Sequence, residues 1–374
     1  MTLDVGPLVD HHCHGLVTDD LDRPAFEALM NEANRPSPLG TSFFDSMLGL
    51  AIRRWCAPVL GLEPHASADD YLARRHELGA SEVNRRLVTE AGISVFLVDT
   101  GLTPETITTP EQLAGVCGGR SREVVRLEAV GQDVLAEGWE PTGFADEVVA
   151  RLRASGAVAA KSIAAYRVGL ALPPRRPDDD ELVAALSDVR PGPGGRYRIA
   201  QPVVNSWLAW TAVELGMPLQ FHVAYGDCDV DLADCDPLKL TAFLRASQDR
   251  GVPVLLLHNY PFHRNAAYLA QVFEHVFMDL GLATHNTGAL SATVLRESLE
   301  LVPFGKMLFS SDAYGLAELY HLAALLFRRG LSDVIGSLVD DGEMTLADAE
   351  HVAQLIGHEN ARRAYAIEED YVAG

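Results

Sequence analysis

The feature that most constrains this chain is the alternation of short apolar runs with segments of helical periodicity. Apolar runs of strand length occur eight times, and most segments between them place apolar residues three and four positions apart. Strands that alternate with helices pair as a parallel sheet, and eight of them close into a barrel. The sequence therefore predicts an α/β fold of the (β/α)8 TIM-barrel class. The expected strands are Leu8–His14, Ser94–Thr100, Val124–Val130, Ala157–Ala164, Pro218–Val223, Val252–His258, His275–Leu280 and Lys306–Asp312.

The interval between the first and second expected strands is about twice as long as the others. It contains "TSFFDSMLGLAIRRWCAPVLG" and "SEVNRRLVTEAG", both of helical character. We expect residues 15–92 to form a helical insertion in the first loop at the barrel mouth. No linker or low-complexity tract interrupts the 374 residues, so a single domain over 1–374 is expected.

The charge and cysteine content limit the classes of partner and compartment. A formal net charge of −22 argues against nucleic acid or an anionic membrane surface as a partner. No apolar run reaches membrane-spanning length, and no secretory leader pattern begins the chain. The five cysteines are scattered without a CxxC pair, which is typical of reduced thiols. We therefore expect a cytoplasmic protein with a small-molecule substrate, for which a homo-oligomer is compatible with a large barrel.

Four potential metal ligands are crowded into "VDHHCHG", residues 9–15. Side chains alternate between the two faces of a strand, so Asp10, His12 and His14 share one face, and His11 and Cys13 share the other. Barrel enzymes keep their chemistry at the carboxyl ends of the strands. The sequence therefore predicts that His12 and His14 point to the barrel axis, with Asp10 one layer below them.

Ligand-type residues also lie on four other expected strands. His222, His258 and Asp312 come at strand ends, and Lys161 lies within an apolar strand. A single such residue is usually a helix cap, a satisfied polar group or a snorkelling lysine. Five strands that carry them together predict a metal centre with nitrogen and oxygen ligands, which suit zinc, iron or manganese.

The order H-x-H, Lys, His, His, Asp at successive strands resembles the amidohydrolase superfamily. "FSSDA" and "LIGHENARRAYAI" are similar to the amidohydrolase-2 type. "KSIAAYRVGL", "HNYPFHRNAAYLA" and "SSDAYGLAELYHLA" resemble the amidohydrolase-like domain that is fused to glutamine synthetase in fungal developmental and plant nodulin-type proteins. The resemblance extends over essentially the whole chain and is most specific from Lys161 onward.

The resemblance implies a set of metal ligands. His12, His14 and Asp312 would bind a first divalent transition metal, with zinc the leading candidate and manganese or iron the alternatives. His222 and His258 would bind a second ion or orient the nucleophile. Lys161 matches the position that is carboxylated and bridges the ions in two-metal members. An inward lysine beside cations is repelled unless it is neutralised, which favours two ions over one.

The resemblance also implies a reaction, hydrolysis of an amide or other C–N bond through metal-activated water. Asp312 would accept the proton of the water, and His258 or a metal would polarise the scissile carbonyl. A γ-glutamyl or N-acyl amide that carries a carboxylate is the expected substrate. Arg167 could clamp that carboxylate, although a structural salt bridge is the equal alternative. The expected substrate-binding residues are Tyr166, Arg167, His263 and Glu318.

Two other functions remain open at this stage. Amidohydrolase-2 relatives include metal-dependent decarboxylases, in which the ion orients a carboxylated substrate. A non-catalytic barrel that acts as a partner of glutamine synthetase is the second alternative. Release of carbon dioxide rather than an amine would identify the first, and a lack of any activity would favour the second.

Overall fold

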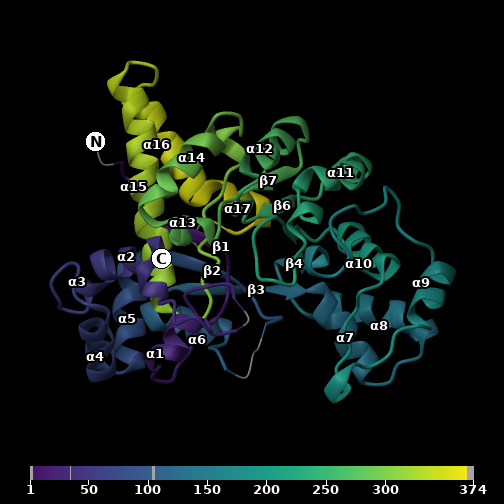
Figure 1. Ribbon diagram of the computed structural model, residues 1–374. Coiled ribbons are helices and arrows are strands. Elements are labelled where there is room, and N and C mark those ends of the chain that lie inside the picture. Colours follow the sequence, from purple (N-terminus) through teal and green to yellow (C-terminus); the bar gives the residue numbers. More distant parts are fainter. Residues whose placement is uncertain (1–2, 34, 103–105, 369–374) are drawn as a thin grey trace. The chain divides into compact units, whose positions relative to one another are not determined.

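The computed structural model describes residues 3–33, 35–102 and 106–368 (Figure 1). Contacts within the chain group it into two compact units. The first unit comprises residues 1–122, 226–228 and 279–374, and the second comprises residues 123–225 and 229–278. Each unit is described by itself below, and the single domain over 1–374 stays a prediction. No helix among the described residues is long and apolar enough to cross a membrane.

The strands of the first unit carry the H-x-H pair. Strand β1 (Leu8–Cys13) pairs in parallel with β2 (Ile93–Asp99), and every residue of β1 is buried. Residues 307–313 also bond to β1: the amide of His11 donates to the carbonyl of Phe309 at 3.2 Å, and the amide of Asp312 donates to the carbonyl of His12 at 3.0 Å. This segment takes the place of the predicted eighth strand.

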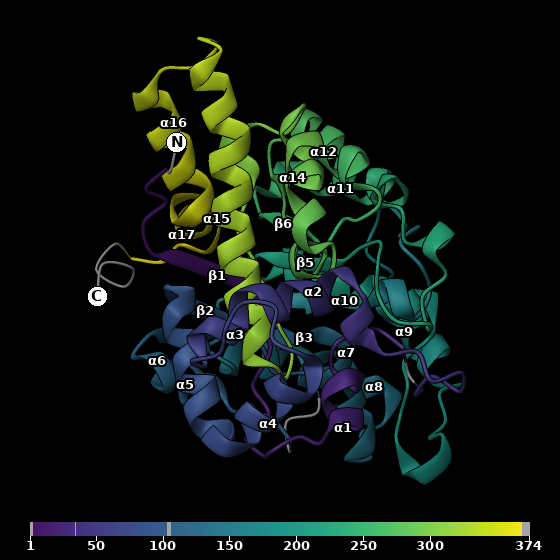
Figure 2. The ribbon, with the colours of Figure 1, turned by 60° about the vertical axis from the view of Figure 1, so that its left-hand side comes forward.

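The helices of the first unit are built around α15, which runs for 24 residues. Helices α5, α14 and α16 pack against it, and Figure 2 shows α16 beside it. Helix α5 ends at Gly92, whose φ of 62° is a left-handed conformation that favours glycine. The bounds are α1 Arg23–Ala28, α2 Met47–Ala51, α3 Ala57–Val59, α4 Ala68–Leu78, α5 Ala80–Ala91, α6 Pro110–Cys117, α13 Ala283–Asn286, α14 Ser291–Leu299, α15 Ala317–Asp340, α16 Leu346–Gln354 and α17 Asn360–Tyr365.

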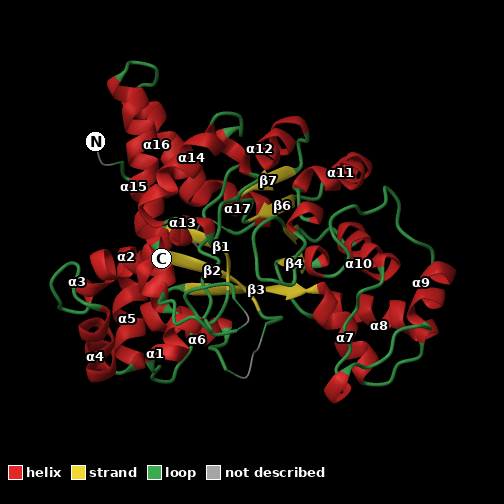
Figure 3. Cartoon of the chain, viewed as in Figure 1, coloured by secondary structure: helices red, strands yellow, loops and turns green. Residues whose placement is uncertain are grey.

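The second unit alternates strands with helices, as the colours of Figure 3 show. Its strands are β3 (Arg120–Arg126, of which residues 123–126 belong to this unit), β4 (Ala159–Ser162), β5 (Leu219–His222), β6 (Val254–Leu257) and β7 (Val276–Met278). Each pairs in parallel with the next. Because both faces of a parallel strand are covered, β4, β5 and β6 are buried throughout. The helices are α7 Leu127–Ala136, α8 Pro141–Ala154, α9 Asp179–Leu186, α10 Pro202–Glu214, α11 Thr241–Ser247 and α12 His263–Val272.

Parallel strands that follow one another in chain order and alternate with helices confirm the predicted fold class. The third and the eighth predicted strands differ most from the structure. The third strand ends at Arg126, because residues 127–130 already begin α7 and their apolar side chains serve a helix. The eighth predicted strand, Lys306–Asp312, is not regular: residues 304–306 form a helical turn, and Asp312 has a φ of 49° that interrupts an extended backbone.

Candidate metal centre

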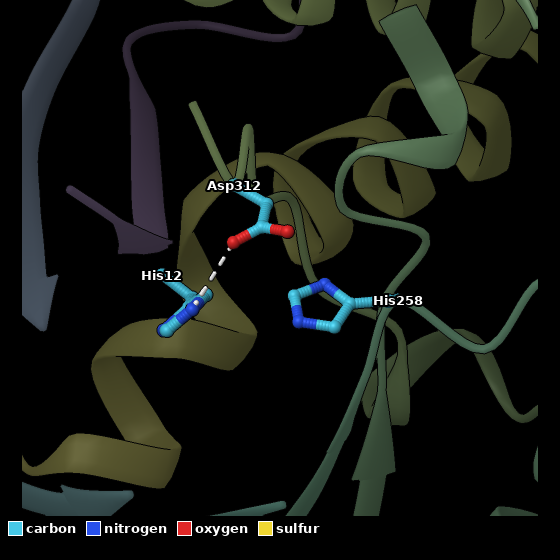
Figure 4. Close-up of side chains that lie close together, drawn as sticks. All are labelled: His12, His258 and Asp312. Atoms are coloured by element: carbon cyan, nitrogen blue, oxygen red, sulfur yellow. Dashed lines mark ion pairs between the residues drawn. The ribbon is translucent and has the colours of Figure 1, made fainter. Parts of the chain in front are cut away.

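Two imidazoles of β1 and its extension lie next to one carboxylate in the first unit. Nε2 of His12 is 3.2 Å from Oδ1 of Asp312, and Nε2 of His14 is 3.6 Å from the same oxygen (Figure 4 shows the His12 pair). Both histidines are buried, and the Asp312 side chain is 13% exposed. The three groups therefore converge on one small volume, as the alternation of side chains along β1 predicts.

The separations fit a shared transition metal. Two ligand atoms that each lie about 2.1 Å from a tetrahedral ion are about 3.4 Å apart. The measured separations of 3.2 and 3.6 Å lie on either side of that value. Imidazole nitrogen with carboxylate oxygen is a donor set of catalytic zinc, iron and manganese sites. The residues present thus fit a divalent transition metal.

The position of Asp312 depends on an unusual backbone. A φ of 49° is costly for a residue with a side chain and persists only where neighbours hold it. Asp10 supplies that hold, since its carboxylate accepts hydrogen bonds from the amide (2.9 Å) and the hydroxyl of Ser311. Complete burial raises the pKa of Asp10 to about 8, against the opposing effect of the two Ser311 bonds. Asp10 therefore lies under the ligands and fixes the turn that presents Asp312.

His14 is oriented by β2 and by α15. Its Nδ1 lies 3.2 Å from the carbonyl oxygen of Asp99, which leaves Nε2 toward Asp312. The hydroxyl of Tyr320 donates to the carbonyl of His14. The Asp99 side chain also lies close, because one ligand atom each of His12, His14 and Asp99 fall within 4.8 Å of one another. Asp99 was missed, although its place at the end of an apolar strand is the signal used for the other ligands.

Two further groups of the first unit interact with Asp312 and were not predicted. Glu32 follows α1, and its pKa is raised to about 7, first by burial and then by the charges of Asp312 and Asp227. His285, on α13, is buried. Burial lowers the pKa of His285 to about 4, against the opposing charge of Asp312. An ordinary polar loop residue and a histidine within a short helix give no sequence signal for such a position.

The other face of β1 makes structural contacts. Nδ1 of His11 is 2.8 Å from the Tyr365 hydroxyl on α17, and its Nε2 is 2.9 Å from the Asp279 carboxylate. The Cys13 thiol lies 3.7 Å from the carbonyl of Leu97 on β2. These two side chains therefore point away from the His12 and His14 side, as the strand parity predicts.

The second unit brings together three of its predicted site residues. The rings of His222 and His258 have centroids 4.6 Å apart, and the Tyr166 ring lies 4.4 Å from that of His222. His258 has a φ of 72°, a second strained backbone at a strand end. Lys161 is 2% exposed in β4. Roles for these residues as ligands or in catalysis stay predictions.

Arg167 and His263 are the predicted substrate residues of this unit. Among the described residues Arg167 forms no ion pair. Its guanidinium makes one long hydrogen bond of 3.5 Å to the Tyr166 carbonyl, and its Nε has no partner there. Burial, and then the charge of Arg198, lower the pKa of Arg167. His263 begins α12 and stacks parallel to Tyr260 at 6.0 Å. The charges of Glu128 and Asp229 oppose the lowering of the Arg167 pKa, and a role for Arg167 as a substrate clamp stays a prediction.

The carboxylate of Glu318 accepts hydrogen bonds from two residues of α4. Nε of Arg75 donates to its Oε1 at 2.6 Å, and the Tyr71 hydroxyl donates to the same oxygen at 2.7 Å. Glu318 and Tyr71 are fully buried, and Arg75 is 6% exposed. Because both partners lie on α4, this cluster ties residues of the region 15–92 to α15. A structural role accounts for these contacts without a substrate.

Glu318→Gln tests that structural role. The substitution leaves the Arg75 guanidinium buried without a counter-charge, so we expect the free energy of unfolding to fall by about 3–5 kcal/mol. Metal content of the folded fraction should not change. Glu82→Gln is the matched control, because Glu82 binds Arg85 and Arg86 on the surface and its loss should have little effect. Unfolding in denaturant is the measurement. If Glu318→Gln had normal stability but lost substrate binding, Glu318 would be a substrate-binding residue.

His321 gives the stability of the protein a pH dependence. Burial lowers its pKa to about 4, against an ordinary value of 6.5. Between these two values the unfolded chain binds a proton that the folded chain does not, so the free energy of unfolding falls as the pH falls from 6.5 toward 4. The contribution is on the order of 3 kcal/mol. Unfolding curves at pH 7, 6 and 5 should show a shallower pH slope for His321→Asn than for the wild type, and equal slopes would refute this origin.

Comparisons with known proteins identify the family of the chain. The family model described as Amidohydrolase (Amidohydro_2) matches residues 9–367. Protein fluG of Emericella nidulans is 26% identical over 404 residues, which cover 97% of this chain and 46% of that protein. The chain thus spans about half the length of that curated relative.

Solved structures are similar along the whole chain. A provisionally assigned metal-dependent hydrolase from Lactobacillus casei ATCC 334 has a TM-score of 0.84 and 29% identity, over 97% of this chain and 96% of the other. A uronate isomerase from Bacillus halodurans C-125 has a TM-score of 0.64 and 15% identity, over 98% and 95%, and shows the fold alone. The family match over residues 9–367 shows that this chain belongs to the amidohydrolase family.

Proposed function

We propose that this protein is a metal-dependent amidohydrolase that hydrolyses the C–N bond of a small amide carrying a carboxylate, with γ-glutamyl and N-acyl amides as the first candidates. The observation that carries the proposal is the convergence of His12 and His14 on one oxygen of Asp312 at ligand spacing. Membership of the amidohydrolase family supports the same reaction class.

Zinc is our first candidate for the metal, because two imidazoles and a carboxylate are a ligand set of catalytic zinc sites. A bound divalent ion supplies Lewis acidity, which lowers the pKa of water toward 7 and polarises a carbonyl. His12, His14 and Asp312 would hold it. We further propose that His222, His258 and a carboxylated Lys161 would hold a second ion. The burial of Lys161 at 2% exposure supports its neutralisation, since a buried ammonium beside cations is unfavourable.

The chain's own groups then move the proton and hold the substrate. In this proposal Asp312 accepts a proton from the attacking water and passes it to the leaving nitrogen. The strained turn held by Asp10 keeps that carboxylate in one orientation, so little reorganisation is needed during the reaction. His258 would donate a hydrogen bond to the scissile carbonyl.

Arg167 is our candidate for the substrate carboxylate. Its guanidinium is half-buried without an ion pair among the described residues, and a planar guanidinium binds a carboxylate through two parallel hydrogen bonds. Tyr166, beside His222, and His263, beside Tyr260, would contact the rest of the substrate.

Arg167→Gln should weaken the binding of substrates that carry a carboxylate. We expect KM to rise about 30-fold, equivalent to about 2 kcal/mol for a lost charged hydrogen-bond pair, with a smaller change in kcat. Arg198→Gln is the matched control, because Arg198 already pairs with Asp229 at 3.3 Å. The comparison uses kcat and KM for an N-acyl amino acid and for its neutral amide. An equal loss for both substrates would show that Arg167 does not recognise the carboxylate.

The proposed function is tested by a substrate screen. Metal-loaded protein is incubated with γ-glutamyl amides, N-acyl amino acids and matched carboxylated aromatic acids, and released amine and carbon dioxide are measured separately. We expect amine release that disappears on chelation. Carbon dioxide release would assign the decarboxylase alternative, and no turnover of any substrate class by metal-loaded protein would count against an amidohydrolase.

A further inference from the structure

A cavity of about 610 Å³ lies in the first unit, at the opposite end of β1 from the metal ligands. Its walls come from residues just before β1, from the start of β2 and from the turn that precedes β3. The predicted ligands His12 and His14 lie at the carboxyl end of β1. The six residues of the strand separate the two ends by about 20 Å, so the cavity is distinct from the candidate metal centre.

The lining of this cavity is chemically one-sided. Arg120 and Arg328 are its charged residues, and Thr89, Ser94 and Cys117 add hydroxyl and thiol groups. None of the described residues that line it carries a carboxylate. The whole chain has a net charge of −22, whereas the charged side chains that line this cavity are two guanidinium groups. Such a lining attracts anions.

The guanidinium of Arg328 is the strongest evidence for an anion site. Its guanidinium donates to the carbonyls of Ala91 (2.6 Å), Gly92 (2.9 Å) and Gly6 (3.5 Å), and among the described residues it forms no ion pair. Burial lowers its pKa, because the buried cation has lost water, and the charge of Asp4 opposes this effect only in part. Buried Arg75, by contrast, is paired with Glu318. A guanidinium has five N–H donors, so Arg328 can bind an anion while it keeps these carbonyls.

We propose that this cavity binds a small anion that carries phosphate or carboxylate groups, held by Arg328 and Arg120 with a hydrogen bond from the Thr89 hydroxyl. The cavity is large enough for a molecule the size of a sugar phosphate or a di- or tricarboxylic acid. The inference does not depend on the reaction at the metal centre, because none of the predicted ligands lines this cavity.

Cys117 provides a local reporter of occupancy. It lines the cavity and is half-buried, whereas Cys228 is exposed and does not line it. The rate of iodoacetamide alkylation at each thiol is followed by peptide mass spectrometry in inorganic phosphate, in citrate and in sodium chloride of matched ionic strength. We expect phosphate or citrate to slow alkylation of Cys117 at least fivefold and to leave Cys228 unchanged. The two arms distinguish a phosphate from a carboxylate ligand, and equal Cys117 rates in all three salts would overturn the proposal.

Variants locate the bound anion. Arg328→Gln and Arg120→Gln should each abolish the protection of Cys117. Arg329→Gln, one position along α15 and stacked on Trp55, is the matched control and should keep it. Circular dichroism checks folding, and if loss of the Arg328 bonds unfolds the chain, Arg120→Gln alone decides. His12→Ala should retain the protection. Protection that survives in folded Arg120→Gln, or that disappears in His12→Ala, would place the anion elsewhere and overturn the assignment.

Discussion

Asp312→Asn is expected to abolish turnover while the protein keeps most of its metal. Asparagine has nearly the same shape and still offers an oxygen where Oδ1 of Asp312 faces His12 and His14. The amide cannot accept the proton of the attacking water, so kcat should fall about 10²–10⁴-fold, as for the loss of a general base. The measurements are kcat on the best amide from the screen and metal content by plasma mass spectrometry.

A control separates this effect from a general loss of negative charge. Asp333→Asn makes the same change on an exposed position of α15 and should leave kcat unaltered. If Asp312→Asn retained full activity, Asp312 would not be the proton acceptor. If it lost metal and activity together, Asp312 would act chiefly as a ligand.

His12→Ala is expected to lose metal and activity together. The substitution removes one of two imidazoles from the site, and even the loss of a group that only orients a ligand costs about 10–100-fold in metal affinity or activity. We therefore expect a decrease in affinity of more than 100-fold, measured by competition with a chromophoric chelator. The protein should stay folded at 25 °C by circular dichroism.

Cys13→Ser is the matched control for His12→Ala. The two residues are neighbours on β1, but the Cys13 thiol faces the Leu97 carbonyl on β2. Its replacement by a hydroxyl of similar shape should leave metal content intact. Loss of metal in Cys13→Ser would mean that the alternation along "VDHHCHG" assigns the wrong face.

The predictable part of the site follows from geometry that is local in sequence. Alternation along a strand is fixed by the backbone, so the separation of His12 and His14 from His11 holds in the structure. Strand bounds were less predictable, because an apolar run does not say where a strand ends. Val124 and Val125 belong to β3, whereas the apolar residues from Leu127 onward start α7.

The contacts of Glu318 could not be predicted from the sequence, because they join residues that are far apart along the chain. A position soon after the last expected strand is typical of a substrate residue, but in the structure Glu318 lies in the first turn of α15 and its partner Arg75 lies 243 positions earlier. No local pattern links two such residues. Glu32 and His285 were missed for the same reason, since their interaction with Asp312 arises only when the chain is folded.

We propose that the reaction depends on a divalent transition metal that His12, His14 and Asp312 hold. The most direct measurement is the metal content of purified, folded protein before and after chelation, together with its activity at each stage. We expect one or two equivalents of metal, loss of activity on chelation and recovery when zinc, manganese or iron is added back. A folded protein that is fully active without metal would contradict this proposal.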